Sequence, residues 1–533
     1  MQEKTGKWIP PDSNETQYSA GHHGWQLVEH AAFLEVRDPG LGTYAISDRP
    51  EAQLVRDIVM SPLGLRGMSV TQLSKLKQHA PIPNIYDFYR TGHILSNYEG
   101  VHRLAPKHPG KPSEEEVLSW KLSVMLDDLA HGIASHLTDM IIEGGFGGKE
   151  QAHQERAQEA WRYGGIYEVL QKHGINVNAS GGIEGYERPP WIESDIPELC
   201  YERVQYTAEE MRLWMESEDE DPDAERIINA LYDLDNLTIT EDGELAFKDE
   251  EMALLFSKAF LLLSTEDWNE PVNRVIEHLI IEGFKYSTYN RRLPQMHRYD
   301  NGHTARLESY TYAIDQDFDY ALRISRDKQD NFMFAISQLL SQIAKEERWR
   351  FVEYKRDQFK RFLLDPRAED YPSAWLNGHV MEYGPASSIV EIDVKPPTKK
   401  ELQAVKTGRA NAAKLIHTTK RGVRYDIQPM KRRYVDPLIM TANGAKRLSE
   451  VNSIYSGLLD QHARIHASTL KVRLAVSDEY ERLIHQVTQR NRDEAKVDRP
   501  YLKRDQLRWQ IDAAAERSRD AALQAGRLVL DAP

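Results

Sequence analysis

Residues 125–139 read MLDDLAHGIASHLTD, and this stretch decides the expected fold. Apolar side chains recur at three- and four-residue spacing from Leu122 to Met140, which predicts a helix with one buried face. The same helix carries ionisable groups, namely Asp127, Asp128, His131, His136 and Asp139. Buried charge is costly unless it is paired or bound to a metal. The stretch therefore indicates a chemical site inside a helical core.

The composition describes a large globular chain. Its 533 residues are 40% hydrophobic, with a formal net charge of −15 and a mean hydropathy of −0.62. We expect at least two structural units, and no apolar run is long enough to span a bilayer. The start lacks the apolar segment of a secretory signal, and Cys200 is the single cysteine, so we expect a cytoplasmic location.

Most of the chain has the periodicity of helices, and one region differs. Helices are predicted over 227–235, 252–264, 272–281 and 331–363, and the acidic run 216–225 is predicted to be a solvated loop. Residues 388–394 and 423–427 have the composition of strands. We predict a mainly α protein with an N-terminal extension (1–37), a helical catalytic domain (38–385), a basic strand-containing lobe (386–445) and a C-terminal helical region (446–533).

Further motifs surround the opening stretch. Arg90 and His93 are three residues apart, so a helix would present both on one face. Downstream come His153, then Glu202-Arg203 with Tyr206, and Glu210 one turn later.

In this order the motifs resemble the HD-domain deoxynucleoside triphosphate triphosphohydrolases, the family of bacterial dGTPases and of the mammalian SAM- and HD-domain enzyme. Segments 38–42, 76–78 and 433–437 are similar to three further fragments of that family. The resemblance implies a helical HD-domain core with a smaller mixed α/β lobe and terminal helices. It also implies the reaction of a dNTP with water to give a deoxynucleoside and inorganic triphosphate.

The resemblance implies a metal site with two departures. The predicted ligands are His93, Asp127, Asp128 and Glu202, where Asp127 replaces the family's histidine and Glu202 its second aspartate. Carboxylate oxygens favour Mg²⁺ or Mn²⁺, while Fe, Co and Zn are also compatible. The rival interpretation is a metal-free, inactive site.

The remaining site roles also come from the resemblance. His131, Asp139 and His153 are the expected catalytic relay, and Arg90 and Arg203 are expected to clamp phosphate oxygens. The residues expected around the sugar and base are Gln78, His136, Tyr206 and Glu210.

Each of these residues also has a purely structural interpretation. His93 alone would more often be a core histidine. The alternatives for the others are a solvated helix turn at Asp127-Asp128, which the apolar residues on both sides disfavour, a surface position for His153, and a simple ion pair of Glu202 with Arg203. His462 and His466 have the i, i+4 spacing of metal ligands, yet no third ligand lies nearby in the sequence, so we expect a solvated helix face.

Residues 395–433 hold 12 lysines and arginines against Glu401 and Asp426. This basic segment fits a polyanion, either a regulatory nucleotide at a subunit contact or single-stranded nucleic acid, or else a solvated region that balances an acidic neighbour. Because family members assemble as tetramers or hexamers with nucleotide activators, we expect a nucleotide-regulated homo-oligomer.

Two other functions stay open. One is a different HD-domain reaction on a phosphodiester or a nucleoside monophosphate. The other is a nucleotide-binding regulator whose catalytic site has decayed. Depletion of dNTPs would serve either pool control or defence against phage.

Overall fold

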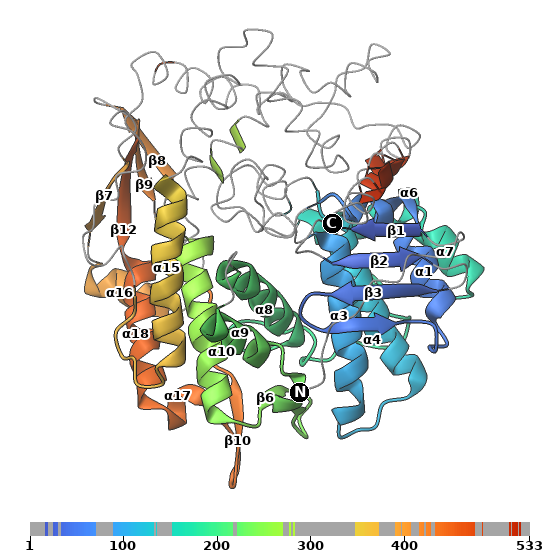
Figure 1. The fold of residues 1–533 in the computed structure, drawn as a ribbon, viewed down its shortest axis with the longest axis horizontal. Coiled ribbons are helices and arrows are strands. Elements are labelled where there is room, and N and C mark those ends of the chain that lie inside the picture. Colours follow the sequence, from blue (N-terminus) through green and yellow to red (C-terminus); the bar gives the residue numbers. More distant parts are fainter. Residues whose placement is uncertain are drawn as a thin grey trace.

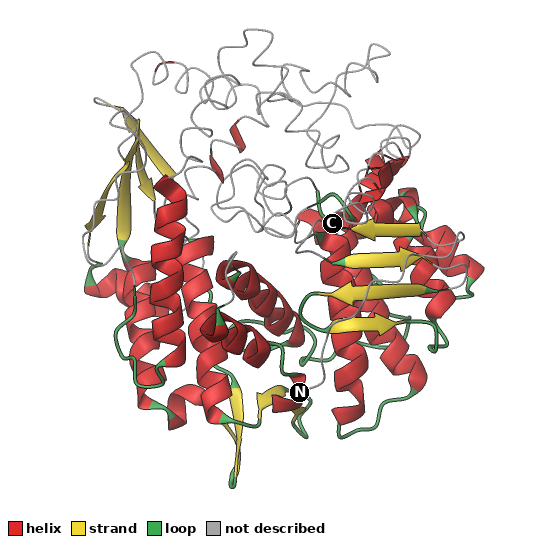
Figure 2. Cartoon of the chain, in the orientation of Figure 1, coloured by secondary structure: helices red, strands yellow, loops and turns green. Residues whose placement is uncertain are grey.

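The computed structural model describes residues 16–19, 25–29, 33–70, 89–132, 135, 152–216, 221–269, 277–278, 281–282, 347–372, 390–395, 397–406, 415–419, 423–427, 432–474, 482 and short pieces between 511 and 523. This part of the chain is mainly helical with three small sheets, as predicted (Figure 2). None of its helices is sufficiently long and apolar to cross a membrane.

The first sheet lies in the N-terminal region. Its strands are β1 (Thr16–Ser19), β2 (Gln26–Glu29), β3 (Leu34–Asp38) and β4 (Gly42–Ala45), antiparallel and in chain order. Apolar side chains such as Leu27, Leu34 and Val36 are buried because alternate residues of a strand face the same side. They share a core with the helices that follow (Figure 1). The sheet therefore spans the boundary that we predicted at residue 38.

The helices of this first core are α1 (Ala52–Val59), α2 (Pro62–Gly67), α3 (Arg90–Leu104), α4 (Glu114–Asp127), α6 (Ala152–Tyr163) and α7 (Ile166–Lys172). Helix α4 begins at a capping box, in which Ser113 and Glu116 satisfy each other's backbone N–H groups. Helix α3 packs on α4 along one side and on α8 (Tyr201–Met215) along another.

One glycine sets the spacing of α3 and α8. A Cβ atom on Gly100 of α3 would lie 1.8 Å from the ring of Tyr201, the first residue of α8. Only glycine permits this approach, because a side chain would overlap the ring. The start of α8 is thus held against α3.

The helix that we predicted from Leu122 to Met140 is not continuous, and residues 133–134 and 136–140 lie outside the described part of the chain. Helix α4 ends at Asp127, a 3₁₀ turn follows (η3, Asp128–Ala130), and the backbone leaves the helical region at His131. The indole Nε1 of Trp161 on α6 donates to the carbonyl of Leu126 at 3.1 Å. This bond satisfies one of the carbonyl groups that a helix end leaves open.

The second core contains α8, α9 (Pro222–Leu231), α10 (Glu250–Leu263) and α15 (Glu347–Leu364). Helix α10 continues into a π-helical turn, Ser264–Trp268. The prediction of a loop over 216–225 is wrong in its last part, because Asp221 caps α9 and Pro222 occupies the first turn, where proline needs no hydrogen bond.

The two remaining sheets tie distant segments together. Strands β5 (Leu237–Ile239), β6 (Leu245–Phe247), β10 (Leu438–Thr441) and β11 (Gly444–Arg447) form one sheet, in which β10 runs parallel to β6. Strands β7 (Val390–Lys395), β8 (Leu415–Thr419), β9 (Val423–Ile427) and β12 (Thr469–Leu474) form the other, in the order β7-β12-β9-β8. The strands predicted at 388–394 and 423–427 are confirmed as β7 and β9.

Helices α16 (Lys399–Lys406), α17 (Leu448–Val451) and α18 (Ser453–Ala467) lie in the C-terminal part of the described chain. The prediction that His462 and His466 lie on a solvated face of α18 is wrong. Both are buried, with ring centroids 4.3 Å apart, and His462 Nε2 lies 3.4 Å from Ser264 Oγ. This face of α18 instead packs on the π-helical turn.

Candidate functional site

The first turn of α3 supplies two buried polar residues. Arg90 is the first residue of the helix and His93 lies one turn later, as their spacing predicted. Their side chains are 2% and 0% exposed. Neither can be a solvated surface group, so each needs a partner inside the protein.

Asp128, which follows the last residue of α4, is the partner of both. Its Oδ1 atom lies 2.7 Å from Arg90 Nη1 and 3.1 Å from His131 Nε2, and its Oδ2 atom lies 2.9 Å from His93 Nε2. Arg90 Nε also donates to Ser135 Oγ at 3.0 Å. A single buried carboxylate thus contacts one guanidinium and two imidazoles.

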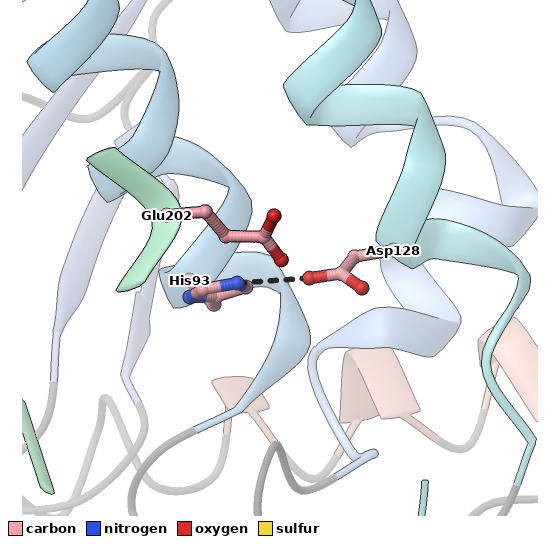
Figure 3. A group of neighbouring side chains, drawn as sticks. All are labelled: His93, Asp128 and Glu202. Carbon is pink, nitrogen blue, oxygen red and sulfur yellow. Dashed lines mark ion pairs between the residues drawn. The ribbon is translucent and has the colours of Figure 1, made fainter. Parts of the chain in front are cut away.

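Glu202 completes a cluster at this carboxylate. It lies in the first turn of α8, and its carboxylate points toward His93 and Asp128 (Figure 3). One ligand atom from each of these three residues lies within 4.8 Å of the other two. Ligands at 2.0–2.6 Å from a common ion are separated by such distances, so the three can hold a divalent metal.

The hydrogen bonds of His93 suit a metal ligand. Its Nδ1 atom lies 2.5 Å from Gln205 Oε1, one turn beyond Glu202, so the ring donates its proton there. Nε2 faces Asp128 Oδ2 at 2.9 Å and lies 3.1 Å from Asn97 Nδ2. A ligating histidine commonly donates its other N–H group to such an oxygen. The cluster therefore has the ligand atoms that a metal requires, and Gln205 orients the imidazole ring.

The two carboxylates differ in their electrostatics. Burial raises the pKa of Asp128, but Arg90 together with hydrogen bonds from His131 and His93 holds that pKa well below its usual range. Burial, reinforced by the charges of Asp128, Glu193 and Asp127, raises the pKa of Glu202 well above its usual range. A cation between them would favour the ionised form of both.

Asp127, the fourth predicted ligand, is not part of the cluster. The structure explains this difference, because Asp127 Oδ2 faces Nη1 of Arg188 at 3.4 Å. Arg188 lies in the loop between α7 and α8, and the sequence analysis assigned it no role. Where the predicted set had one imidazole and three carboxylates, the atoms that lie close enough to share an ion come, among the described residues, from one imidazole and two carboxylates.

Three residues predicted to bind substrate lie farther along α8. The Arg203 guanidinium donates to the carbonyls of Glu198 and Ser194, both at 2.5 Å. Tyr206 packs on Trp268 with ring centroids 5.7 Å apart, and Glu210 accepts a hydrogen bond from the Trp268 indole at 2.5 Å. Their roles toward phosphate and sugar stay predictions.

Other predicted residues lie outside the described part of the chain. These are Gln78, His136 and Asp139, and for His153 only its place on α6 is described. Sequence reasoning also missed Asn97, Gln205 and Arg66, whose Nη1 donates to the His131 carbonyl at 2.7 Å. Helical spacing could have revealed the first two, which lie four and three residues beyond His93 and Glu202.

Comparison with known proteins gives no family. No family model matches the chain, and no curated protein matches it in sequence. Among solved structures, a phosphohydrolase from Bacteroides thetaiotaomicron is 14% identical with a TM-score of 0.45, covering 83% of this chain and 99% of its own. A hypothetical protein from Aquifex aeolicus is 14% identical with a TM-score of 0.43, covering 87% and 99%. Such similarity is too remote to transfer an activity.

Proposed function

We propose that this chain is a metal-dependent phosphohydrolase of the HD type that cleaves deoxynucleoside triphosphates into deoxynucleoside and inorganic triphosphate. The observation that carries the proposal is the environment of Asp128. One buried carboxylate faces a histidine, an arginine and a second histidine, with Glu202 beside it. A pairing for stability alone would not need a second carboxylate among these groups.

His93, Asp128 and Glu202 would hold the metal. When bound there, a divalent ion supplies Lewis acidity to a phosphoryl oxygen and lowers the pKa of a coordinated water. Two carboxylates and one imidazole form a set rich in oxygen, which supports Mg²⁺ or Mn²⁺, with Fe, Co or Zn as further candidates.

His131 has the position of a general acid. Its Nε2 atom faces Asp128, and the carboxylate stabilises the protonated imidazole. A protonated histidine can donate to the oxygen that leaves phosphorus. The carbonyl of His131 is held by the buried guanidinium of Arg66, which fixes the residue just beyond the 3₁₀ turn.

Arg90 supplies positive charge next to the same carboxylate. Its guanidinium is buried in the first turn of α3 and bonded to Asp128 and Ser135. A fixed cation in a water-poor site stabilises the charge that develops on phosphoryl oxygens.

The deoxynucleotide specificity rests on the sequence resemblance. Arg203, Tyr206 and Glu210 follow Glu202 along α8, where the resemblance places the residues that bind phosphate and sugar. The same resemblance also implies nucleotide activation, oligomeric assembly and a role in pool control or phage defence.

The test is to incubate the protein with each dNTP, singly and in mixtures, with Mn²⁺ or Mg²⁺, and to identify products by ³¹P NMR. We expect inorganic triphosphate, no product from Asp128→Asn, and normal product from Asp57→Asn, which removes a paired carboxylate on α1. Release of pyrophosphate or monophosphate would indicate another HD reaction. Nucleotide binding without turnover in every mixture would indicate a regulator.

A further inference from the structure

Arg188 is a second arginine beside the candidate metal cluster, and it makes several hydrogen bonds and ion pairs. Its side chain is 9% exposed. One nitrogen, Nη1, faces Asp127 at 3.4 Å and also bonds the carboxylate of Glu193. The other, Nη2, donates to the carbonyls of Ser123 and Ser180, both at 3.0 Å.

These bonds fix where the guanidinium lies. Ser123 is on the last turn of α4, while Ser180 is in the loop that leads from α7 to α8. The guanidinium therefore bridges α4 and this loop, because it bonds a carbonyl of each. Since Asp127 is the last residue of α4, its carboxylate is held on the loop side.

The charges around the cluster show why this position matters. The carboxylates of Asp127, Glu193 and Glu202 all attract the Arg188 guanidinium. At Glu202, the positive charge of Arg188 partly offsets the repulsion from Asp127 and Glu193. A divalent ion with Asp128 and Glu202 makes a neutral unit, whereas a third carboxylate would make it anionic. A neutral centre repels a polyanionic phosphate substrate less than an anionic one does.

We propose that Arg188 is a positioning residue that withdraws Asp127 from the metal, so that, within the described part of the chain, His93, Asp128 and Glu202 are the ligands. Catalytic metal sites with three protein ligands keep positions open for water and substrate. The inference rests on the metal site of the proposed function, and it adds a residue that determines the number of ligands.

The experiment measures Mn²⁺ binding by isothermal titration calorimetry on the full chain without nucleotide. We expect Asp127→Asn to bind Mn²⁺ within about threefold of the unaltered protein, a difference below about 1 kcal/mol. We expect the adjacent change Asp128→Asn to weaken binding by about 100-fold or more. Equal weakening by both changes would overturn the proposal.

The second arm changes the arginine. Arg188→Gln releases Asp127, so we expect tighter Mn²⁺ binding by about tenfold, corresponding to about 1.4 kcal/mol. The double variant Arg188→Gln with Asp127→Asn should return to the original affinity, and Arg188→Lys should retain it. Unchanged Mn²⁺ affinity in a folded Arg188→Gln protein would refute the proposed role.

A matched control separates this effect from the loss of any buried arginine. Arg49, which is 10% exposed and pairs with Glu99 at 2.6 Å, lies outside the metal cluster. Arg49→Gln should leave Mn²⁺ affinity unchanged. The measurement needs no turnover. An inactive protein with the expected binding pattern would therefore refute the proposed reaction and still support the role of Arg188.

Discussion

His131 places its Nε2 atom 3.1 Å from Oδ1 of Asp128, across the point where the helical backbone breaks down. Asp128 begins the 3₁₀ turn and His131 directly follows it, so the two lie at i and i+3, positions whose side chains share one side of such a turn, and the backbone leaves the helical region at His131. Both side chains are almost completely buried. The end of α4 thus brings a candidate acid onto a candidate metal ligand.

His131→Gln should separate catalysis from metal binding. The variant loses the proton donor, so we expect hydrolysis to fall by about 10²–10⁴-fold. Mn²⁺ affinity should stay within about threefold, because His131 is not in the metal cluster. Product assays and calorimetry on one preparation check this, and a parallel loss of both would contradict the assignment.

Divalent metal should stabilise the folded chain. An ion that binds only the native state adds about 2.7 kcal/mol at 100 times its Kd. Thermal melts with increasing Mn²⁺ should therefore show a rising midpoint, which chelation reverses. Asp128→Asn should show no rise, and an equal rise in that variant would place the ion elsewhere.

Gly100→Ala should loosen the site from a distance. The added methyl would overlap the ring of Tyr201, and overpacking costs typically about 1–3 kcal/mol. Since Tyr201 precedes Glu202, relief of the overlap moves Glu202 away from His93. We expect a lower melting midpoint together with weaker Mn²⁺ binding.

Gly457→Ala on α18 is the control for this change. A Cβ atom there has no neighbour within 4 Å, and alanine favours a helix by about 1 kcal/mol. Its midpoint should rise or stay constant with Mn²⁺ binding unchanged. Unaltered Mn²⁺ binding in Gly100→Ala would show that α8 can shift without disturbing the cluster.

Much of the fold could be predicted because periodicity reports local structure. The i, i+3 spacing of Arg90 and His93 gave the correct face of α3, and the composition of 423–427 gave β9. The end of α4 could not be predicted, because apolar spacing continues past Asp127 and the bond from Trp161 that satisfies the helix end comes from a distant helix.

In the candidate site too, local patterns predicted some residues, whereas contacts between distant segments could not be predicted. His93, Asp128 and Glu202 were predicted as ligands from the order of their motifs, and the structure gathers them. Asp127 was placed among them because it stands where the resembled family has a ligating histidine. Its pairing with Arg188 depends on a loop that returns to the end of α4, and no local pattern encodes that return.

Asp57 should make stability sensitive to acid. Burial raises its pKa, but hydrogen bonds from Lys172, His173 and Gln53 bring it to about 2, below the ordinary 3.8. The unfolded chain then binds more protons between pH 4 and pH 2, so this contribution is complete above about pH 4 and is lost as the pH falls toward 2.

Asp57→Asn provides the measurement. Because Lys172 is largely exposed, solvent screening limits the difference in unfolding free energy to about 1 kcal/mol. Denaturant unfolding of both proteins should show this difference at pH 6 and none near pH 2. A difference that persists at pH 2 would contradict the assigned ionisation.

Lys258 should make the stability of the fold depend on pH in the alkaline range. Its ammonium is buried against the end of α15, donating to the carbonyls of Phe362 and Asp365. Burial lowers its pKa to about 8 from 10.5. Between these values the unfolded chain holds the extra proton, so stability rises with pH as the cost of burying the charge disappears.

Lys258→Met removes this titration and keeps an unbranched side chain. At pH 7 we expect a loss of about 1–3 kcal/mol, because two buried carbonyls lose their donor. Relative to the variant, the original protein should gain on the order of 1 kcal/mol between pH 8 and pH 10, allowing for screening. If the free energy of unfolding changed with pH in the same way in both proteins, the lowered pKa of Lys258 would be refuted.

The close packing of α3 on α8 at Gly100 has a consequence for the chain as a polymer. His93, Asp128 and Glu202 come from separate segments, so an ion held by all three would cross-link a stretch of more than a hundred residues. A chain with one cysteine has no internal disulfide to close such loops. Unlike a covalent bridge, which also restricts the unfolded chain, the ion would join these segments only while α3 and α8 stay packed, and it would release them on unfolding.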